Sequence, residues 1–92
     1  MYLFDRNKAS KKICYTNKVE QSNYGEICKI NDKVGILMEF QDTGLDISFF
    51  VNKINMGVAF KGLPIDTYFP CCVLYFDGSK VKLESSVPFP DI

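Results

Sequence analysis

The side chains that could perform catalysis or bind a metal are few in this chain. Histidine is absent, which removes the commonest general base and a common metal ligand. Four cysteines stand at positions 14, 28, 71 and 72, and no two of them have Cys-x-x-Cys spacing. Because structural zinc sites draw on cysteine and histidine at such spacings, the sequence predicts no metal site and no cofactor.

A nucleophilic cysteine would need a neighbour that lowers the pKa of its thiol. Cys28 beside Lys29 is the nearest arrangement, yet a charged residue next to a cysteine is commonplace. The carboxylates Asp42 and Asp46 fall at a predicted hairpin end, where a solvated turn explains them better than acid–base chemistry. No phosphate-loop, dinucleotide or Gly-x-Ser-x-Gly motif is present. We therefore predict that the protein is not an enzyme.

The composition predicts a folded domain without a strong electrostatic preference. The 92 residues are expected to form a single domain, and 47% of them are hydrophobic and 14% aromatic. Eleven basic residues balance eleven acidic ones, so the broad positive surface that nucleic-acid or anionic-membrane binding requires is not expected. The lysines that could still form a local basic patch are Lys8, Lys11, Lys12 and Lys18.

The remaining compositional signals concern compartment. Apolar runs are too short to span a membrane, and the N-terminus lacks the apolar segment of a signal peptide. The cysteines are expected to be free thiols, which indicates a reducing compartment, the cytoplasm or the nucleus.

The middle of the chain alternates between apolar and polar residues with a period of two. Residues 34–40 and 45–51 both show this pattern, which predicts two half-buried antiparallel strands joined by a four-residue turn at 41–44. The apolar face of the first strand consists of Val34, Ile36, Met38 and Phe40. The phenylalanines expected in the core are Phe40, Phe49 and Phe60.

Outside this hairpin the pattern is weaker but still favours strands over helices. No window shows a convincing helical period, and short apolar runs alternate with turn signals, which indicates an all-β sandwich or barrel. The polar stretch 17–26 is loop-like, and Gly62 and Pro64 predict a loop over 61–67. The other segments predicted to be extended are 2–4, 12–16, 56–60, 68–75 and 80–84.

Several aromatic residues stand where they could contact a partner. Tyr75 and Phe76 abut the Asp77-Gly78 turn, and aromatic side chains at a loop tip offer a large contact area at small entropic cost. An equally good explanation is that one of them covers the end of the core. Tyr2 and Phe4 share one face of the first strand, which leaves them open as core or as contact residues.

Taken in order, residues 2–90 resemble the C-terminal part of a SPRY domain. Each matching segment is generic β sequence, and the order and spacing together carry the resemblance. The matching segments are Tyr24-Gly25, "NDKVGI" at 31–36, "LDISFFVN" at 45–52, "MGVAF" at 56–60, Tyr68-Phe69-Pro70, and Val81 with Leu83.

The chain also departs from the family pattern in two places. The family's N-terminal strands, with patterns of the "HYWEV" and "W-x-VGV" type, have no counterpart, so an incomplete sandwich is expected. Lys53 stands where the family has a turn glycine after Asn52. Since a type I′ turn requires positive φ at both central residues, which lysine adopts reluctantly, either another turn type or tolerated strain is expected.

The resemblance implies a bent antiparallel β-sandwich of the concanavalin-like jelly-roll type that acts as a protein-interaction module of a larger protein or complex. In the tripartite-motif branch of the family, one early strand and one late loop contact the partner. The positions of this chain that match them are Tyr2, Phe4, Asp5, Tyr75, Phe76, Asp77 and Gly78.

Our leading hypothesis is a non-catalytic module that recognises a short peptide or a protein surface through loops at the sheet edges. The alternative is a small β-barrel that binds single-stranded nucleic acid through exposed aromatics and the N-terminal lysines, with steep salt dependence. Because the early strands of the family's sandwich have no counterpart in this sequence, we expect an unpaired sheet edge, and with it a homodimer or completion by another chain segment.

Overall fold

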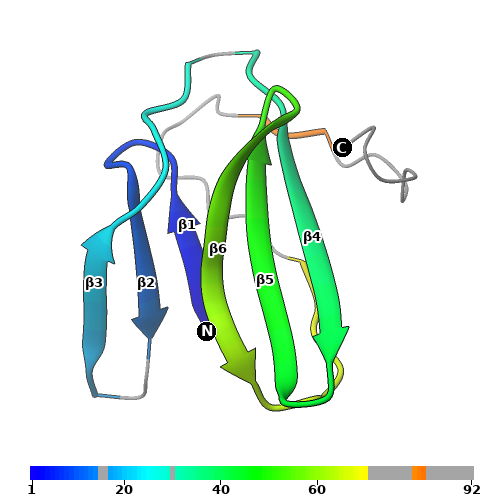
Figure 1. Cartoon of the computed structure of the whole chain (residues 1–92). Helices are drawn as coiled ribbons and strands as arrows, with labels where there is room; N and C mark the ends of the chain where they lie inside the picture. Colours follow the sequence, from blue (N-terminus) through cyan, green and yellow to red (C-terminus); the bar gives the residue numbers. More distant parts are fainter. Residues whose placement is uncertain (15–16, 30, 71–79, 83–92) are drawn as a thin grey trace.

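The computed structural model of the chain describes residues 1–14, 17–29, 31–70 and 80–82, and within them it contains six strands (Figure 1). Each sheet has three antiparallel strands, in the order β1-β2-β3 and β4-β5-β6. The prediction of an all-β antiparallel sandwich is confirmed. Over the same residues no helix could cross a membrane. The strands are β1 (Tyr2–Asp5), β2 (Ser10–Cys14), β3 (Val19–Asn23), β4 (Val34–Gln41), β5 (Gly44–Val51) and β6 (Ile54–Leu63).

The first sheet begins with a strand that presents its aromatic side chains to the second sheet. Tyr2 packs edge-on against Phe60 with ring centroids 5.1 Å apart, and Phe4 lies 5.2 Å from Phe49. At the end of β1, the buried Asp5 accepts a hydrogen bond from the backbone N–H of Asn7. These contacts fix the turn into β2 and hold the first sheet against the second.

The third strand of this sheet corrects the sequence prediction, which assigned residues 17–26 to a loop. β3 pairs with β2 over five residues, although all five of its side chains are exposed. Backbone hydrogen bonds to β2 define this strand, and no buried face is needed. The apolar alternation that reveals strands is therefore missing from its sequence.

In the second sheet, β4 and β5 form a hairpin whose register runs unbroken from Val34 opposite Val51 to Gln41 opposite Gly44. The predicted four-residue turn at 41–44 is therefore confirmed, with residues 42 and 43 at its centre and both strands extending into its ends. Gly44 has φ of 142°, and a Cβ there would lie 2.8 Å from the carbonyl oxygen of Leu63. Only glycine fits at this close approach of β5 to the end of β6.

The turn between β5 and β6 shows which backbone conformation Lys53 adopts. Asn52 and Lys53 have φ of 49° and 69°, so both central residues adopt the left-handed conformation of a type I′ turn. The Asn52 side chain accepts a hydrogen bond from the Lys33 backbone N–H and donates one to Asp32. This network joins the turn to the start of β4. Of the two expectations for Lys53, tolerated strain is the one that the structure shows, because the lysine keeps the positive φ of the glycine that it replaces.

The hydrophobic core lies between the sheets and is formed mainly by β5 and β6. Phe49 and Phe60 are buried as predicted, but the prediction for Phe40 is wrong, because 61% of that residue is exposed. Among the described residues, β4 contributes only Met38 to the packing around the core. The core cluster consists of Leu45, Ile47, Phe49, Ala59, Phe60 and Leu63, with Tyr2, Phe4, Ile13, Tyr24, Met38 and Tyr68 packed against it.

Candidate functional site

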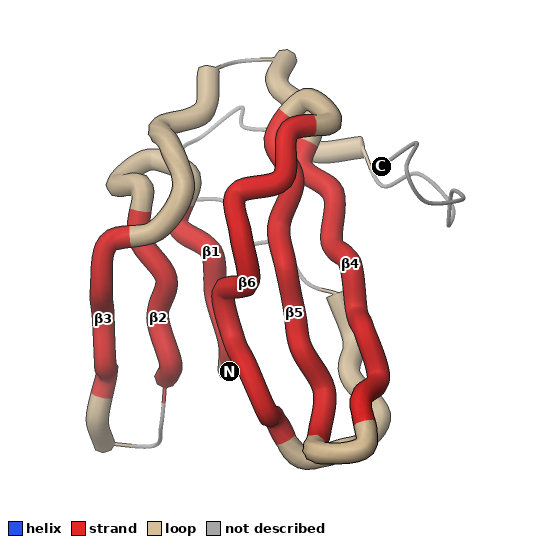
Figure 2. The backbone as a smooth tube through the Cα atoms, in the orientation of Figure 1, coloured by secondary structure: helices blue, strands red, loops and turns tan. Residues whose placement is uncertain are grey.

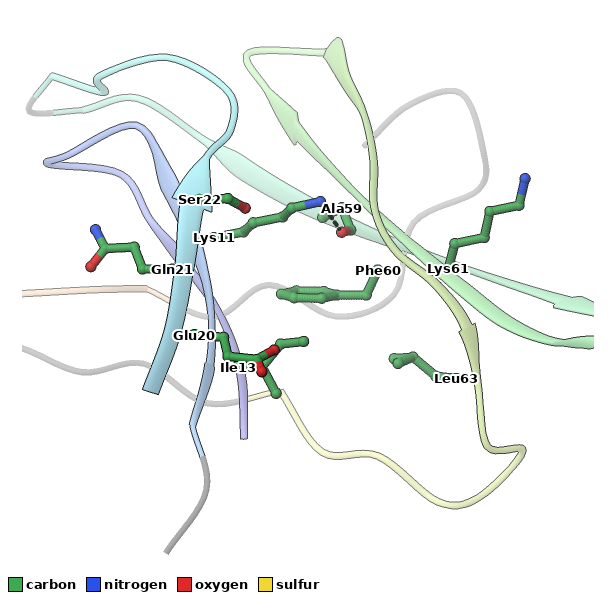
Figure 3. A pocket seen from close by; sticks show the side chains of 9 residues that line it. All are labelled: Lys11, Ile13, Glu20, Gln21, Ser22, Ala59, Phe60, Lys61 and Leu63. Atoms are coloured by element: carbon green, nitrogen blue, oxygen red, sulfur yellow. Dashed lines mark hydrogen bonds between the residues drawn. The ribbon is translucent and has the colours of Figure 1, made fainter. Parts of the chain in front are cut away.

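A groove of about 320 Å³ lies between β2 and β3 of the first sheet and β6 of the second (Figure 3). Ile13, Phe60 and Leu63 supply apolar surface, and Glu20 and Lys61 supply charge. The groove forms where β2 and β3 of the first sheet face the β6 edge of the second. The residues that line it are Lys11, Ile13, Glu20, Gln21, Ser22, Ala59, Phe60, Lys61 and Leu63.

The β6 wall of the groove is irregular, and Figure 2 shows the strand bending along its length. Its pairing with β5 contains three shifts in register. Wherever β6 has one residue more than β5, a β-bulge leaves backbone groups outside the ladder. Such groups need another partner, because a buried and unpaired backbone polar group costs stability. The strand also runs through Leu63, beyond the loop start that was predicted at residue 61.

Tyr24 supplies the partner at the first bulge. Its hydroxyl accepts a hydrogen bond from the backbone N–H of Phe49 at 3.2 Å and donates one to the carbonyl oxygen of Gly57 at 2.6 Å. Burial raises the pKa of this hydroxyl above its usual value, and the hydrogen bond from Phe49 opposes that rise. The neutral phenol can donate as well as accept, so it bridges the two strands where the ladder cannot.

Lys11 supplies the partner at the second bulge. From β2 its Nζ reaches across the groove and donates to the carbonyl oxygen of Ala59 at 2.7 Å, drawn as a dashed line in Figure 3. The same ammonium lies 5.8 Å from the ring centroid of Tyr24 and 6.0 Å from that of Phe60. These distances allow cation–π attraction, which compensates part of the hydration that the lysine loses.

The third bulge is closed from within the second sheet. The carboxylate of Asp46 on β5 accepts a hydrogen bond from the backbone N–H of Gly62 at 2.9 Å. A carboxylate that sequence reasoning explained as part of a solvated turn therefore stabilises the end of β6. All three irregularities in β6 are compensated by side chains, two of them from outside its own sheet.

The groove could bind a short extended segment of polypeptide. Its floor is apolar and its rim is charged and polar, which is the usual anatomy of a peptide-binding surface. Glu20 lies at the rim, where its ion pair with Lys18, at 3.1 Å, is exposed to solvent. Because an exposed pair is weak, the Glu20 carboxylate is accessible to a basic ligand group. The Lys61 side chain extends away from Lys11 in Figure 3.

Potential metal ligands and thiols are the groups among the described residues that could support chemistry. Among them, no three potential metal ligands of the histidine, cysteine or carboxylate type lie together. Cys14 and Cys28 are free thiols, and burial raises the pKa of the Cys28 thiol, which favours the unreactive protonated form. Cys28 is therefore a poor nucleophile despite its neighbour Lys29.

The structure describes three of the predicted partner-binding residues, and two of them lie between the sheets. Tyr2 and Phe4 are half-buried, with their rings against Phe60 and Phe49. Asp5 is buried and pairs with Lys12 at 3.4 Å. These contacts use the three side chains within the fold, and their part in partner binding stays a prediction. Tyr75, Phe76, Asp77 and Gly78 lie outside the described residues.

Sequence reasoning missed the groove. Ser22 and Glu20 were placed in a loop, and Lys11 was considered only as part of a basic patch. The signal that could have found them is the alternation of β2, since Lys11 and Ile13 share one face of a strand with a polar neighbour between them.

The sequence model of the SPRY domain matches residues 1–87, which is nearly the whole chain. Neither the curated proteins nor the solved structures contain a match.

Proposed function

Because the chain belongs to the SPRY domain family, we propose that it recognises a short extended peptide of a partner protein. The family consists of protein-interaction modules that are generally non-catalytic. The single observation that supports a peptide ligand is the groove between β3 and β6, with its apolar floor and charged rim. A peptide of a few residues in the extended conformation fits a cleft of this shape and size.

The irregular pairing of β6 indicates how the peptide is held. Its bulges interrupt the regular ladder that an added strand would need, and the Ala59 carbonyl oxygen is already bonded to Lys11. The ligand is therefore held by its side chains rather than by strand addition. An apolar side chain packs against Phe60 and Leu63, and a basic group pairs with Glu20.

The basic residues near the N-terminus favour a protein ligand over nucleic acid. Lys11 donates to a backbone carbonyl oxygen, and Lys12 pairs with the buried Asp5. Two of the four lysines that a basic patch would require are thus engaged within the protein. A phosphate backbone would have to compete with these contacts.

The test is selection of peptides from a displayed random library on the immobilised full chain, followed by measurement of dissociation constants. Ser22→Tyr fills the groove and Glu20→Lys reverses the charge at its rim. We expect each change to weaken the selected peptide by about tenfold or more, which corresponds to about 1.4 kcal/mol. The matched control is Glu26→Lys, an exposed charge reversal outside the groove, which should leave affinity unchanged.

The same experiment tests the predicted loop. A Tyr75→Ala, Phe76→Ala double variant that abolishes binding, while Ser22→Tyr has no effect, would move the site to residues 75–78. If no peptide is enriched over an immobilised control protein, the chain does not recognise short peptides. Circular dichroism spectra of all variants establish that losses of affinity come from the site and not from unfolding.

A further inference from the structure

The charged groups of the groove stand at two levels along its length. Lys11 on β2 lies opposite Ser22 on β3, and Ile13 lies opposite Glu20 in the same pairing. Figure 3 shows Lys11 and Ser22 on one side of the Phe60 ring, and Ile13 and Glu20 on the other. Alternate residues of a strand are about 6–7 Å apart, so this distance separates a basic level from an acidic level.

The basic level can bind an anion. The Lys11 ammonium has three N–H donors, and its bond to the Ala59 carbonyl oxygen, at 2.7 Å, uses one of them. The Ser22 side chain is exposed and lies on the groove side of β3 in Figure 3, so it adds a hydroxyl donor at the same level. A carboxylate, with its two acceptor oxygens, matches an ammonium beside a hydroxyl.

The acidic level can bind a cation. The Glu20 side chain is 50% exposed, and its exposed ion pair with Lys18 contributes little stability, so a ligand cation can replace Lys18 at small cost. Ile13, directly opposite Glu20 in the register, supplies apolar surface for the stem of a lysine or an arginine. This level therefore suits a long basic side chain.

The β6 wall faces both levels and is apolar at its centre. Phe60 and Leu63 line it, and the Phe60 ring lies between the two levels in Figure 3. Side chains of an extended peptide alternate between two faces, and those on one face are two positions apart. A peptide that lies along the groove thus places two side chains against β2 and β3 and the one between them against β6.

We propose that the groove selects peptides in which one acidic and one basic residue flank a single apolar residue. The acidic side chain bonds to Lys11 and Ser22, and the basic side chain pairs with Glu20. The apolar side chain between them packs against Phe60. Because the two ends of the groove carry opposite charge, a given peptide binds in one direction only. This inference names the ligand class of the proposed peptide site and rests on that proposed function.

Synthetic peptides of one composition test the spacing on the wild-type full chain. Each carries one glutamate, one leucine and one arginine in a glycine–serine sequence, with the two charges one, two or three positions apart and in both orders. Fluorescence anisotropy titrations measure their dissociation constants. A peptide with any other spacing loses one of the two ion pairs, so we expect the best peptide with a spacing of two to bind about fivefold more tightly than the rest.

The outcomes separate this inference from peptide binding itself. Equal affinities for the three spacings, or a peptide enriched from the random library that lacks the pattern, overturn the inference and leave peptide binding standing. If neither the spaced peptides nor the library yields a binder, both proposals are wrong. The series uses no variant, so it holds whether or not the substituted proteins fold.

Exchange of charge between protein and peptide tests the acidic level. In the best peptide, replacement of arginine by glutamate should weaken binding to the wild type about tenfold, and Glu20→Lys should restore most of that loss. The matched control is Glu26→Lys, an exposed charge reversal outside the groove, which should keep the wild-type preference for arginine. A Glu20→Lys variant that still prefers arginine overturns the assignment of the basic residue to Glu20.

Discussion

The two outer strands of the second sheet, β4 and β6, flank the same central strand and have opposite characters. β4 is regular, pairs with β5 without interruption and leaves Phe40 exposed. β6 is bulged, yet it buries Phe60 against the first sheet. The regular strand is thus the one that is poorly covered, and the irregular strand is the one that is well packed.

The difference shows that regular pairing and burial are supplied by different parts of this protein. The bulges of β6 are tolerated because Lys11 and Tyr24, which are outside its sheet, bond to the carbonyl oxygens of Ala59 and Gly57. Among the described residues, β4 is held by its ladder with β5 and by the packing of Met38 against the core. The irregularity of β6 is therefore a consequence of docking, whereas the regularity of β4 follows from its ladder with β5.

We expect the largest difference in stability between alanine variants of Phe60 on β6 and Phe40 on β4. Phe60→Ala should lower the free energy of unfolding by about 3–5 kcal/mol, because it removes a buried ring and leaves a cavity. Phe40→Ala should lower it by less than about 1 kcal/mol, since that ring is mostly exposed. Urea denaturation of the two variants and the wild type measures both. Equal losses would show that β4 and β6 are equally packed.

The next effect concerns the second bulge of β6. Lys11→Met keeps most of the apolar stem but leaves the Ala59 carbonyl oxygen without its partner. We expect the free energy of unfolding to fall by about 1–3 kcal/mol. The control is Lys61→Met, an exposed lysine on the same groove, which should change it by less than about 0.5 kcal/mol. If both changes cost the same, the bulge does not depend on Lys11.

Tyr24 gives a smaller effect with a signature in pH. Tyr24→Phe removes the bridge between Phe49 and Gly57 and should cost about 1–2 kcal/mol at neutral pH. Because burial raises the pKa of the hydroxyl, its stabilisation is complete below the unfolded pKa of about 10 and is lost as the pH rises through the folded value. The stability difference between wild type and variant, measured from pH 7 to 11, should therefore shrink at alkaline pH. A constant difference would contradict a raised pKa of the Tyr24 hydroxyl in the folded protein.

The smallest effect lies where β4 begins. Hydrogen bonds from Asn52 and from the Lys29 backbone lower the pKa of the Asp32 carboxyl below its ordinary value. Its stabilisation is present above that ordinary value, about 3.9, and is lost as the pH falls through the lower folded value. Asp32→Asn should therefore be slightly less stable than the wild type at pH 7 and equal to it near pH 2. Thermal unfolding at both pH values measures this, and a variant as stable as the wild type at pH 7 would contradict it.

Much of the fold could be predicted from the sequence where burial imposes a pattern. The alternation in β5 marks a strand that is buried almost throughout, and the turn at Asn52 was recognised by its asparagine. β3 was missed because its side chains are all exposed and nothing in their order records the pairing with β2. Phe40 was misplaced because alternation identifies the face of a strand but not whether another sheet reaches it.

The candidate site was harder to predict for a related reason. The groove depends on how β2 and β3 of the first sheet face β6 of the second. This is a property of sheet docking and not of any local segment. The bonds from Lys11 to Ala59 and from Tyr24 to Gly57 join residues 48 and 33 positions apart. From the sequence alone, a lysine on a strand is interpreted as a surface charge, because the bulge that it compensates is not visible there.

The order of strands within each sheet has a consequence for how the chain folds. Both sheets consist of strands that are consecutive in sequence, so every strand pairing among the described residues closes a short loop. Short loops cost little entropy to close, and local pairing of this kind is fast. We expect the β4-β5-β6 meander, with its two-residue turns, to form early and the association of the two meanders to limit the folding rate. In that late step Lys11 and Tyr24 reach β6, so its bulges acquire their final partners last.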